Sequence, residues 1–277
     1  MSYQIDYAYT CHIGNVRANN EDNFWCCGET LPAENQGIEG VHSGSVHNTR
    51  LPVLSVFDGM GGESCGEIAA FLAAEEFGRY YSMNKKGLKK NPGQFLEDAC
   101  FSMNEAICIY GAENKVRSMG TTMAMAAFTP GSVYICNLGD SRIYQSFQGQ
   151  FRQISTDHVV KANMFGKAPL TQYLGIPNDE IALDPDVTQL DYISGSRYLL
   201  CSDGMTDMLS DGEIADILTR EIPVGETVEL LLERTLKKGG KDNVTIVLCQ
   251  VSDHEEKNPL RMLFKRHKKV ISEGDVS

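Results

Sequence analysis

Several aspartates of this sequence lie close to glycines at points where an apolar run ends. The stretches concerned are Phe57-Asp58-Gly59, Gly139-Asp140-Ser141, Cys201-Ser202-Asp203-Gly204 with Asp207, and Gly240-Lys241-Asp242-Asn243. Any one of them is weak evidence for a site, because Asp and Gly are the commonest turn residues. Carboxylates gathered from all four stretches would repel one another unless a cation lay between them. The pattern therefore indicates a cation site, and the alternative is a set of ordinary turns.

The residue types at these positions favour particular ions and a particular reaction. They offer hard oxygen ligands with no histidine or cysteine, which favours Mg2+ or Mn2+ over zinc. Asp203 and Asp207 are four residues apart, so a helix after Gly204 would direct both toward one ion. Two ions bridged by a carboxylate can activate water and neutralise a phosphoryl group, and phosphate monoesters hydrolyse very slowly without catalysis. The predicted chemistry is metal-dependent hydrolysis of a phosphate ester.

Arg17 is the candidate for holding the phosphate. A guanidinium group matches phosphate oxygens with two parallel hydrogen bonds. The alternative is a surface ion pair with Glu21, which lies four residues further along the chain. On spacing alone the ion pair is favoured.

The elements that position these residues follow from the hydrophobic pattern. Val53 to Phe57 is an apolar run typical of a buried strand, and the glycines after Asp58 allow a sharp turn into a helix that begins at Gly66. Other strands are expected at residues 3–9, 121–128, 133–138, 142–147, 151–154, 187–192, 198–201 and 244–251. Short turns join four of them into an antiparallel meander. Helices are expected at 66–81, 96–110, after the capping box Ser210-Asp-Gly-Glu213, and around 228–235.

Three segments are expected to lack regular structure. They are a surface loop at about 28–50, a basic linker at 85–93 and an irregular flap at about 157–185. We expect one phosphatase catalytic domain over residues 1–252. The remainder, 253–277, is dense in Lys and Arg and is expected to be a mobile, solvated tail.

Composition excludes several classes of protein. The chain has 277 residues and a net charge of -12, which disfavours nucleic acid as a partner, although an acidic protein can handle phosphate if metal ions supply positive charge. We expect no membrane span and no secretory signal, because no apolar run is long enough and the start of the chain lacks the basic and apolar regions of a signal. The nine cysteines include no CxxC pair, which indicates mostly buried thiols in a reducing cytoplasm.

The motifs occur in a fixed order along most of the chain, from about residue 6 to 251. They are Arg17-x-x-Asn20-Glu21-Asp22, Asp58-Gly-Met-Gly-Gly62 with Gly66-Glu67, Gly120-Thr121-Thr122, Gly139-Asp140-Ser141-Arg142, Asp157-His158, Leu174-Gly175, Leu200-Cys-Ser-Asp203-Gly204 with Asp207, and Gly240-x-Asp242-Asn243-Val-Thr245. In this order they resemble the metal-dependent Ser/Thr protein phosphatases (PPM type, the protein phosphatase 2C-like family) in their compact bacterial form.

The resemblance implies a fold and a set of roles. The fold would be an α+β, four-layer α-β-β-α sandwich with two central antiparallel sheets flanked by helix pairs. Mn2+ or Mg2+ would occupy two core sites and possibly a third, with metal-activated water as the nucleophile and no phospho-enzyme. The implied assignments are Asp58 as the bridging ligand, Asp203 and Asp242 completing one ion, the Gly59 carbonyl serving the other, Glu21 acting through water, Asp22 orienting its neighbours, Asp140 and Asp207 joining Asp203 at the third metal, and Arg17 binding phosphate.

The chain departs from the family pattern at three places. Met60 stands where eukaryotic members have a histidine, and Glu63 where many bacterial members have one. The proton donor to the leaving group is therefore open between metal-bound water, Glu63 and a loop histidine. Val159 replaces the usual serine after Asp157-His158, and the flap is short.

Two classes of function remain. The first is an active phosphatase of phosphoserine and phosphothreonine in proteins, with a Ser/Thr kinase and its targets as substrates and a monomeric chain. A phosphatase dedicated to one regulatory switch would use the same site. The second is a pseudophosphatase that binds phosphoproteins without turnover. Because pseudoenzymes of this fold usually lose metal aspartates, the five aspartates present here favour catalysis.

Overall fold

Two antiparallel sheets form the centre of the molecule. In the computed structural model, residues 2–61, 65–116, 118–160, 168–177 and 181–253 are described. One sheet has the order β3 (His42–His47), β1 (Tyr3–His12), β12 (Val244–Asp253), β11 (Arg197–Cys201), β8 (Arg142–Phe147) and β9 (Gln150–Gln153). The other has the order β10 (Asp186–Asp191), β7 (Ser132–Leu138), β6 (Met123–Phe128), β4 (Val53–Gly61) and β2 (Asp22–Cys26), and β5 (Met119–Thr121) pairs with the end of β4.

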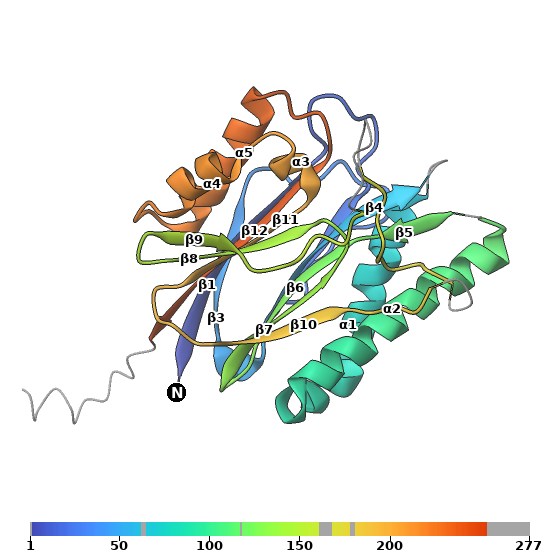
Figure 1. Ribbon diagram of the computed structural model, residues 1–277, viewed down its shortest axis with the longest axis horizontal. Coiled ribbons are helices and arrows are strands. Elements are labelled where there is room, and N and C mark those ends of the chain that lie inside the picture. The colour runs from blue at the N-terminus through green and yellow to red at the C-terminus, as the bar shows by residue number, and fades with distance from the viewer. Residues whose placement is uncertain (1, 62–64, 117, 161–167, 178–180, 254–277) are drawn as a thin grey trace, which may run out of the picture.

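Helices cover the outer face of each sheet (Figure 1). The long helices α1 (Gly66–Lys90) and α2 (Pro92–Asn114) pack on the sheet that contains β4. The short α3 (Asp203–Thr206), α4 (Asp211–Leu218) and α5 (Val224–Lys237) pack on the other sheet. The predicted four-layer α+β sandwich is confirmed.

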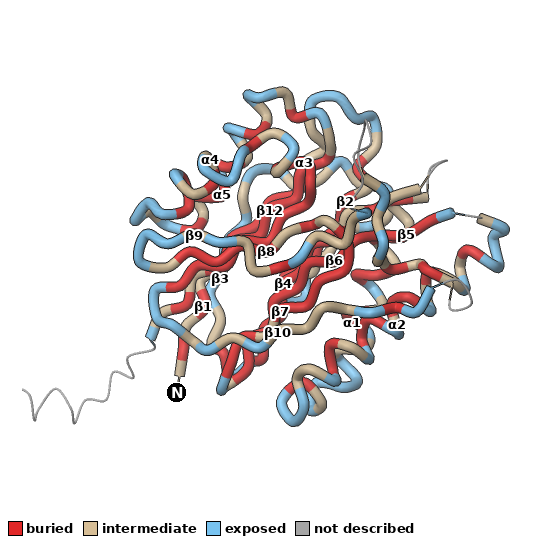
Figure 2. The backbone as a smooth tube through the Cα atoms, viewed as in Figure 1, coloured by how far each residue is buried: buried red, intermediate tan, exposed pale blue. Residues whose placement is uncertain are grey.

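The strand β4 shows why the apolar run before Asp58 is continuous. Leu54 and Val56 point into the core between the sheets, whereas Val53 and Phe57 point into the core beneath α1 and α2. A strand that is buried on both faces needs apolar residues at successive positions instead of alternate ones. Figure 2 shows the same distribution, with buried segments concentrated in the two sheets.

The structure corrects the sequence prediction at three places. The expected linker at 85–93 is helical up to Lys90, where α1 buries Leu88, and α2 starts with Pro92 at its first position.

The expected loop at 28–50 contains β3 and a short 3-10 helix, Asn48–Arg50. The hydrophobic pattern gave no signal for β3, since HSGSVH is a polar edge strand held by backbone pairing with β1. The expected strand at 121–128 is divided at Thr122 into β5 and β6. The expected tail lies almost wholly outside the described residues.

The cysteines agree with the expectation of free thiols. None of the nine forms a disulfide, and six of them are buried. The capping box at Ser210 and Glu213 is also confirmed at the start of α4.

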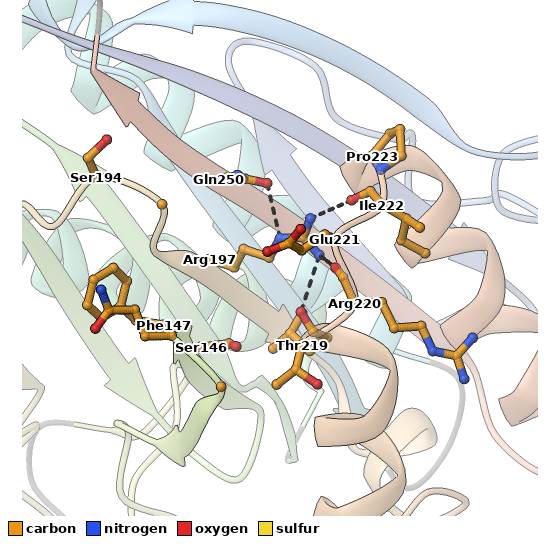
Figure 3. Close-up of a pocket in the computed structure, with 14 residues that line it drawn as sticks. Ser146, Phe147, Ser194, Arg197, Thr219, Arg220, Glu221, Ile222, Pro223 and Gln250 are labelled. Carbon is orange, nitrogen blue, oxygen red and sulfur yellow. Dashed lines mark hydrogen bonds between the residues drawn. The ribbon is translucent and has the colours of Figure 1, made fainter.

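A cavity of about 630 Å³ lies between the β8–β9 turn and the segment after α4. Figure 3 shows Arg197 reaching across it toward Ile222 and Gln250. The Arg197 side chain donates to Gln250 Oε1 at 3.0 Å, Arg220 O at 2.8 Å and Leu218 O at 3.2 Å, and also to Ile222 O. Burial lowers the pKa of Arg197. The backbone carbonyls of Leu218, Arg220 and Ile222 lie at the end of α4 and just after it, so Arg197 serves as a structural cap for that helix.

Replacing Arg197 by methionine is expected to lower the free energy of unfolding by about 3 kcal/mol, because buried carbonyls lose their donors. Urea unfolding followed by circular dichroism measures the change. The matched control is Arg220→Met, since Arg220 lines the same cavity but is exposed, and its effect should stay within about 0.5 kcal/mol. Equal losses in the two variants would contradict the capping role.

Candidate metal centre

The end of β4 holds Asp58 by its backbone. Asp58 pairs with Asp22 across the β2–β4 ladder. Its amide donates to Thr122 Oγ1 at 3.2 Å, and its carbonyl accepts from the Thr122 amide at 2.9 Å. Thr122 is the residue that separates β5 from β6, so the interruption of this strand serves to fix the backbone at Asp58.

Close packing explains the glycines that follow Asp58. The Gly59 amide donates to Glu21 O at 3.0 Å, and a Cβ at Gly59 would lie 2.1 Å from Gly66 O. A Cβ at Gly66 would lie 2.8 Å from Glu21 Oε2. The start of α1, the end of β4 and the Glu21 carboxylate therefore pack together with no room for side chains at either glycine.

Asp22 connects the two sheets at this end. Its side chain is only 2% exposed, and its Oδ2 accepts hydrogen bonds from Ser202 Oγ and Thr245 Oγ1, both at 2.7 Å. Burial and the neighbouring negative charge of Asp58 raise the pKa of Asp22 well above its ordinary value. The carboxyl group of Asp22 is thus buried close to Asp58.

The third and fourth aspartate stretches meet at Gly204. A Cβ there would lie 1.9 Å from Asn243 O and 3.4 Å from Asp242 Cβ, so α3 begins directly against the turn that carries Asp242. The predicted helix after Gly204 is present, and the Asp207 amide donates to Asp203 O at 2.7 Å. Asp203 and Asp242 are brought to the same place by this contact.

Arg17 forms an ion pair with Asp242, with 2.7 Å between Nη2 and Oδ2. The alternative pair with Glu21 is not the contact that the structure gives. The hydrogen bond that Arg17 donates to Asp242 raises the pKa of Arg17. For Glu21, burial and the negative charge of Glu67 raise the pKa of the carboxyl group.

The turn at Asp140 is tied to the same strand end. Gly139 has a φ of +98°, and its carbonyl accepts from the His158 amide at 3.0 Å. Ser141 Oγ lies 2.6 Å from Thr122 Oγ1, the atom that also accepts from the Asp58 amide. One threonine hydroxyl therefore links the Asp140 turn to Asp58.

The donor atoms fit a hard divalent cation. The side chains that gather here are carboxylates, and Glu67 Oε2 is buried without a hydrogen-bond partner among the described residues. Burial raises the pKa of Asp22 and of Glu21, and the negative charges of Asp58 and Glu67, respectively, raise them further. Within the described ranges, no three His, Cys, Asp or Glu side chains are grouped tightly enough to hold an ion as they stand. The assignments of Asp58, Gly59, Asp203, Asp242, Asp140 and Asp207 as ligands stay predictions.

Sequence reasoning gave no role to several residues that build this region. Asn243 accepts from the Glu21 amide at 2.8 Å and donates to Ile13 O and Asn19 O, both at 2.9 Å. Thr122 and Thr245 also build this region without having been assigned a role from the sequence. All three belong to recognisable motifs, but only their hydrogen bonds reveal what they do.

The source of the proton for the leaving group stays unassigned. Met60 lies on the strand extension paired with Gly120, and Glu63 is outside the part of the chain that the structure describes. The two histidines of the expected loop are on β3, where His42 packs edge-on against Tyr9 and His47 Nδ1 lies 2.7 Å from Thr49 Oγ1.

Comparison with known proteins identifies the family. The sequence profile described as Protein phosphatase 2C matches residues 42–241. Serine/threonine protein phosphatase PstP of Mycobacterium tuberculosis is 31% identical over 265 residues, which cover 91% of this chain and 46% of PstP. Protein phosphatase PhpP of Streptococcus pneumoniae is 30% identical over 224 residues, which cover 76% of this chain and 90% of PhpP. The chain belongs to the protein phosphatase 2C family, as its motifs predicted.

A solved structure supports the same identification. The catalytic domain of PstP in complex with two manganese ions aligns with a TM-score of 0.71 and 28% identity, covering 91% of this chain and 100% of that one. Our chain spans about half the length of full PstP. Across the residues described, no helix is long and apolar enough to cross a membrane.

Proposed function

We propose that the chain is a Mg2+- or Mn2+-dependent phosphatase that hydrolyses phosphoserine and phosphothreonine in proteins. The observation that carries the proposal is the gathering of Asp22, Asp58, Asp242 and Glu21 around the end of β4, with Arg17 paired to this group. Such a group of carboxylates in a partly buried site is suited to divalent cations.

Each side chain then has a specific task. Asp58 would bridge two ions, Asp203 and Asp242 would complete one of them, and the Gly59 carbonyl and Glu21 would serve the other. Asp140 and Asp207, with Asp203, are the candidate ligands of a third, more weakly bound ion. When bound, the ions would supply Lewis acidity to the phosphoryl group and a water of lowered pKa.

Arg17 and Asp22 act without being ligands in this proposal. Arg17 would leave Asp242 and bind two phosphoryl oxygens, which a half-exposed guanidinium can do at little cost. Asp22 would hold the Asp58 strand end in place through its bonds to Ser202 and Thr245. The orientation of the phosphate and the rigidity of the ligands thus come from different residues.

The substrates would be phosphoproteins, in keeping with the names of PstP and PhpP as protein phosphatases. A Ser/Thr kinase and its targets are the substrates that we propose for this chain. We also propose that residues 1–252 form the catalytic domain of a monomer that works in the cytoplasm, where the nine thiols would stay reduced.

Metal removal tests this proposal. Protein stripped with EDTA is expected to lose hydrolysis of a phosphothreonine peptide and of p-nitrophenyl phosphate, and added Mn2+ or Mg2+ should restore both. A phosphotyrosine peptide serves as the control for substrate class. Folded, metal-loaded protein that turns over neither substrate would contradict the proposal and favour a phosphoprotein-binding pseudophosphatase.

A further inference from the structure

Asn104 is a buried amide on α2 whose partners lie on another segment. The residue is 2% exposed. Its Oδ1 accepts from the amides of Gly175 at 2.7 Å and Ile176 at 3.0 Å, and its Nδ2 donates to Ile176 O at 2.9 Å. The side chain therefore uses its strong hydrogen bonds to hold one piece of chain, the segment that we call the rim segment, residues 171–176.

The opposite side of the rim segment is fixed to β5. Leu174 and Thr121 exchange two backbone hydrogen bonds, each of 2.9 Å. Gly175 has a φ of +105°, and a Cβ there would lie 2.6 Å from Met119 O. The rim segment is thus clamped between α2 and β5, in a conformation that glycine makes possible.

This clamp lies next to the proposed metal centre. Thr121 on β5 pairs with Gly59 on β4, which directly follows Asp58. Two strand spacings separate Leu174 from Gly59, which places the rim segment about 10 Å from the end of β4. Figure 1 shows β5 beside β4 with α2 nearby. Thr171 is exposed, and Gln172 and Tyr173 are partly exposed.

We propose that Asn104 is a positioning residue for the protein substrate, an inference that rests on the proposed function. Asn104 fixes the rim segment against β5. It thereby holds residues 171–173 where the substrate residues on either side of a phosphothreonine would contact them. Asn104 touches neither the phosphate nor a proposed ligand. Its loss should therefore weaken the binding of a phosphopeptide without changing the chemical step.

An amide at this position is not required for packing. The neighbours of Asn104 on the buried face of α2 are Cys100, Met103 and Ile107, and an apolar residue would be equally compatible with that layer. What an apolar residue cannot do is satisfy three backbone groups of the rim segment at once. The hydrogen bonds of Asn104 thus select the position of that segment.

The test compares Asn104→Ala with Asn48→Ala. Asn48 is a matched control, because it is also fully buried and also binds backbone groups, Tyr3 N at 3.2 Å and Thr129 O at 3.4 Å, but it lies in the 3-10 helix before β4, far from Asp58. In Asn104→Ala we expect KM for a phosphothreonine peptide to rise about tenfold, with kcat and the hydrolysis of p-nitrophenyl phosphate changed less than about twofold. Hydrogen exchange at Gly175 and Ile176 should also become faster. Asn48→Ala should leave all of these unchanged.

A second variant and a second measurement allow the positioning role to be tested in every case. If Asn104→Ala does not fold, Gly175→Ala displaces the same segment from the β5 side and should give the same selective rise in KM. If the wild-type chain has no turnover, the proposed function is wrong, and phosphopeptide affinity measured by fluorescence anisotropy replaces KM with the same expected weakening. The positioning role would be overturned if hydrolysis of the peptide and of p-nitrophenyl phosphate fell equally. It would also be overturned if the KM or the affinity for the peptide did not change.

Discussion

Replacing Asp58 by asparagine is expected to lower kcat/KM for a phosphothreonine peptide by about a thousandfold, which corresponds to about 4 kcal/mol of transition-state stabilisation. Asparagine keeps the size of the side chain, so the backbone bonds of residue 58 to Thr122 should survive. The charge that would bridge two cations is lost. Steady-state kinetics at saturating Mn2+ measure the effect.

The same substitution should make the metal-free chain more stable. Burial and the negative charge of Asp58 raise the pKa of Asp22, so removing that charge relieves a repulsion of about 1 kcal/mol. Urea unfolding in EDTA measures this gain, and Asp191→Asn, at an exposed strand end, provides the control. A loss of activity accompanied by a loss of stability would instead indicate that the variant is misfolded.

Replacing Arg17 by methionine is expected to lower kcat/KM for the same peptide by about 30-fold, because charged hydrogen bonds to the phosphate are lost. Most of the change should appear in KM. Arg17 is paired with Asp242 in the structure, so the substitution also frees this carboxylate. Mn2+ affinity should therefore rise about threefold while substrate binding weakens, as expected for a partly exposed ion pair.

Arg79→Met is the matched control for Arg17. Arg79 is an exposed arginine on α1 that pairs with Glu76 at 2.6 Å, away from the carboxylates at the end of β4. Its replacement should change neither the KM for the peptide nor the affinity for Mn2+ by more than about twofold. If Arg17→Met weakens Mn2+ binding and leaves KM unaffected, Arg17 supports the ligands and does not bind the phosphate.

The fold could be predicted wherever burial leaves a recognisable pattern of apolar residues in the sequence. The continuous run of β4 and the helical spacing of Leu96, Met103 and Ile107 led directly to the observed elements. Prediction failed where backbone pairing determines the structure, as in the polar edge strand β3. It also failed in α1, where the lysines suggested a linker although the helix continues and buries Leu88.

The sequence pointed to candidate site residues, whose roles as ligands stay predictions, but it could not show their arrangement. Glycine neighbours and motif order pointed to Asp58, Asp203 and Asp242, and the structure brings these stretches to one end of the sandwich. The pair between Arg17 and Asp242 spans 225 positions, so spacing could only suggest the nearby Glu21. Asn104 has partners 71 and 72 residues away, and no local pattern could show them.

Titration of the EDTA-stripped chain with Mn2+ in a calorimeter is the most direct test of the central claim, a dinuclear centre bridged by Asp58. The account predicts that the wild-type chain binds two ions with high affinity and a third more weakly, and that hydrolysis of the phosphothreonine peptide rises as the two high-affinity sites fill. Asp58→Asn should bind fewer ions and show no such rise. Binding of two ions by Asp58→Asn with wild-type affinity, or full hydrolysis by the stripped wild-type chain, would contradict the claim.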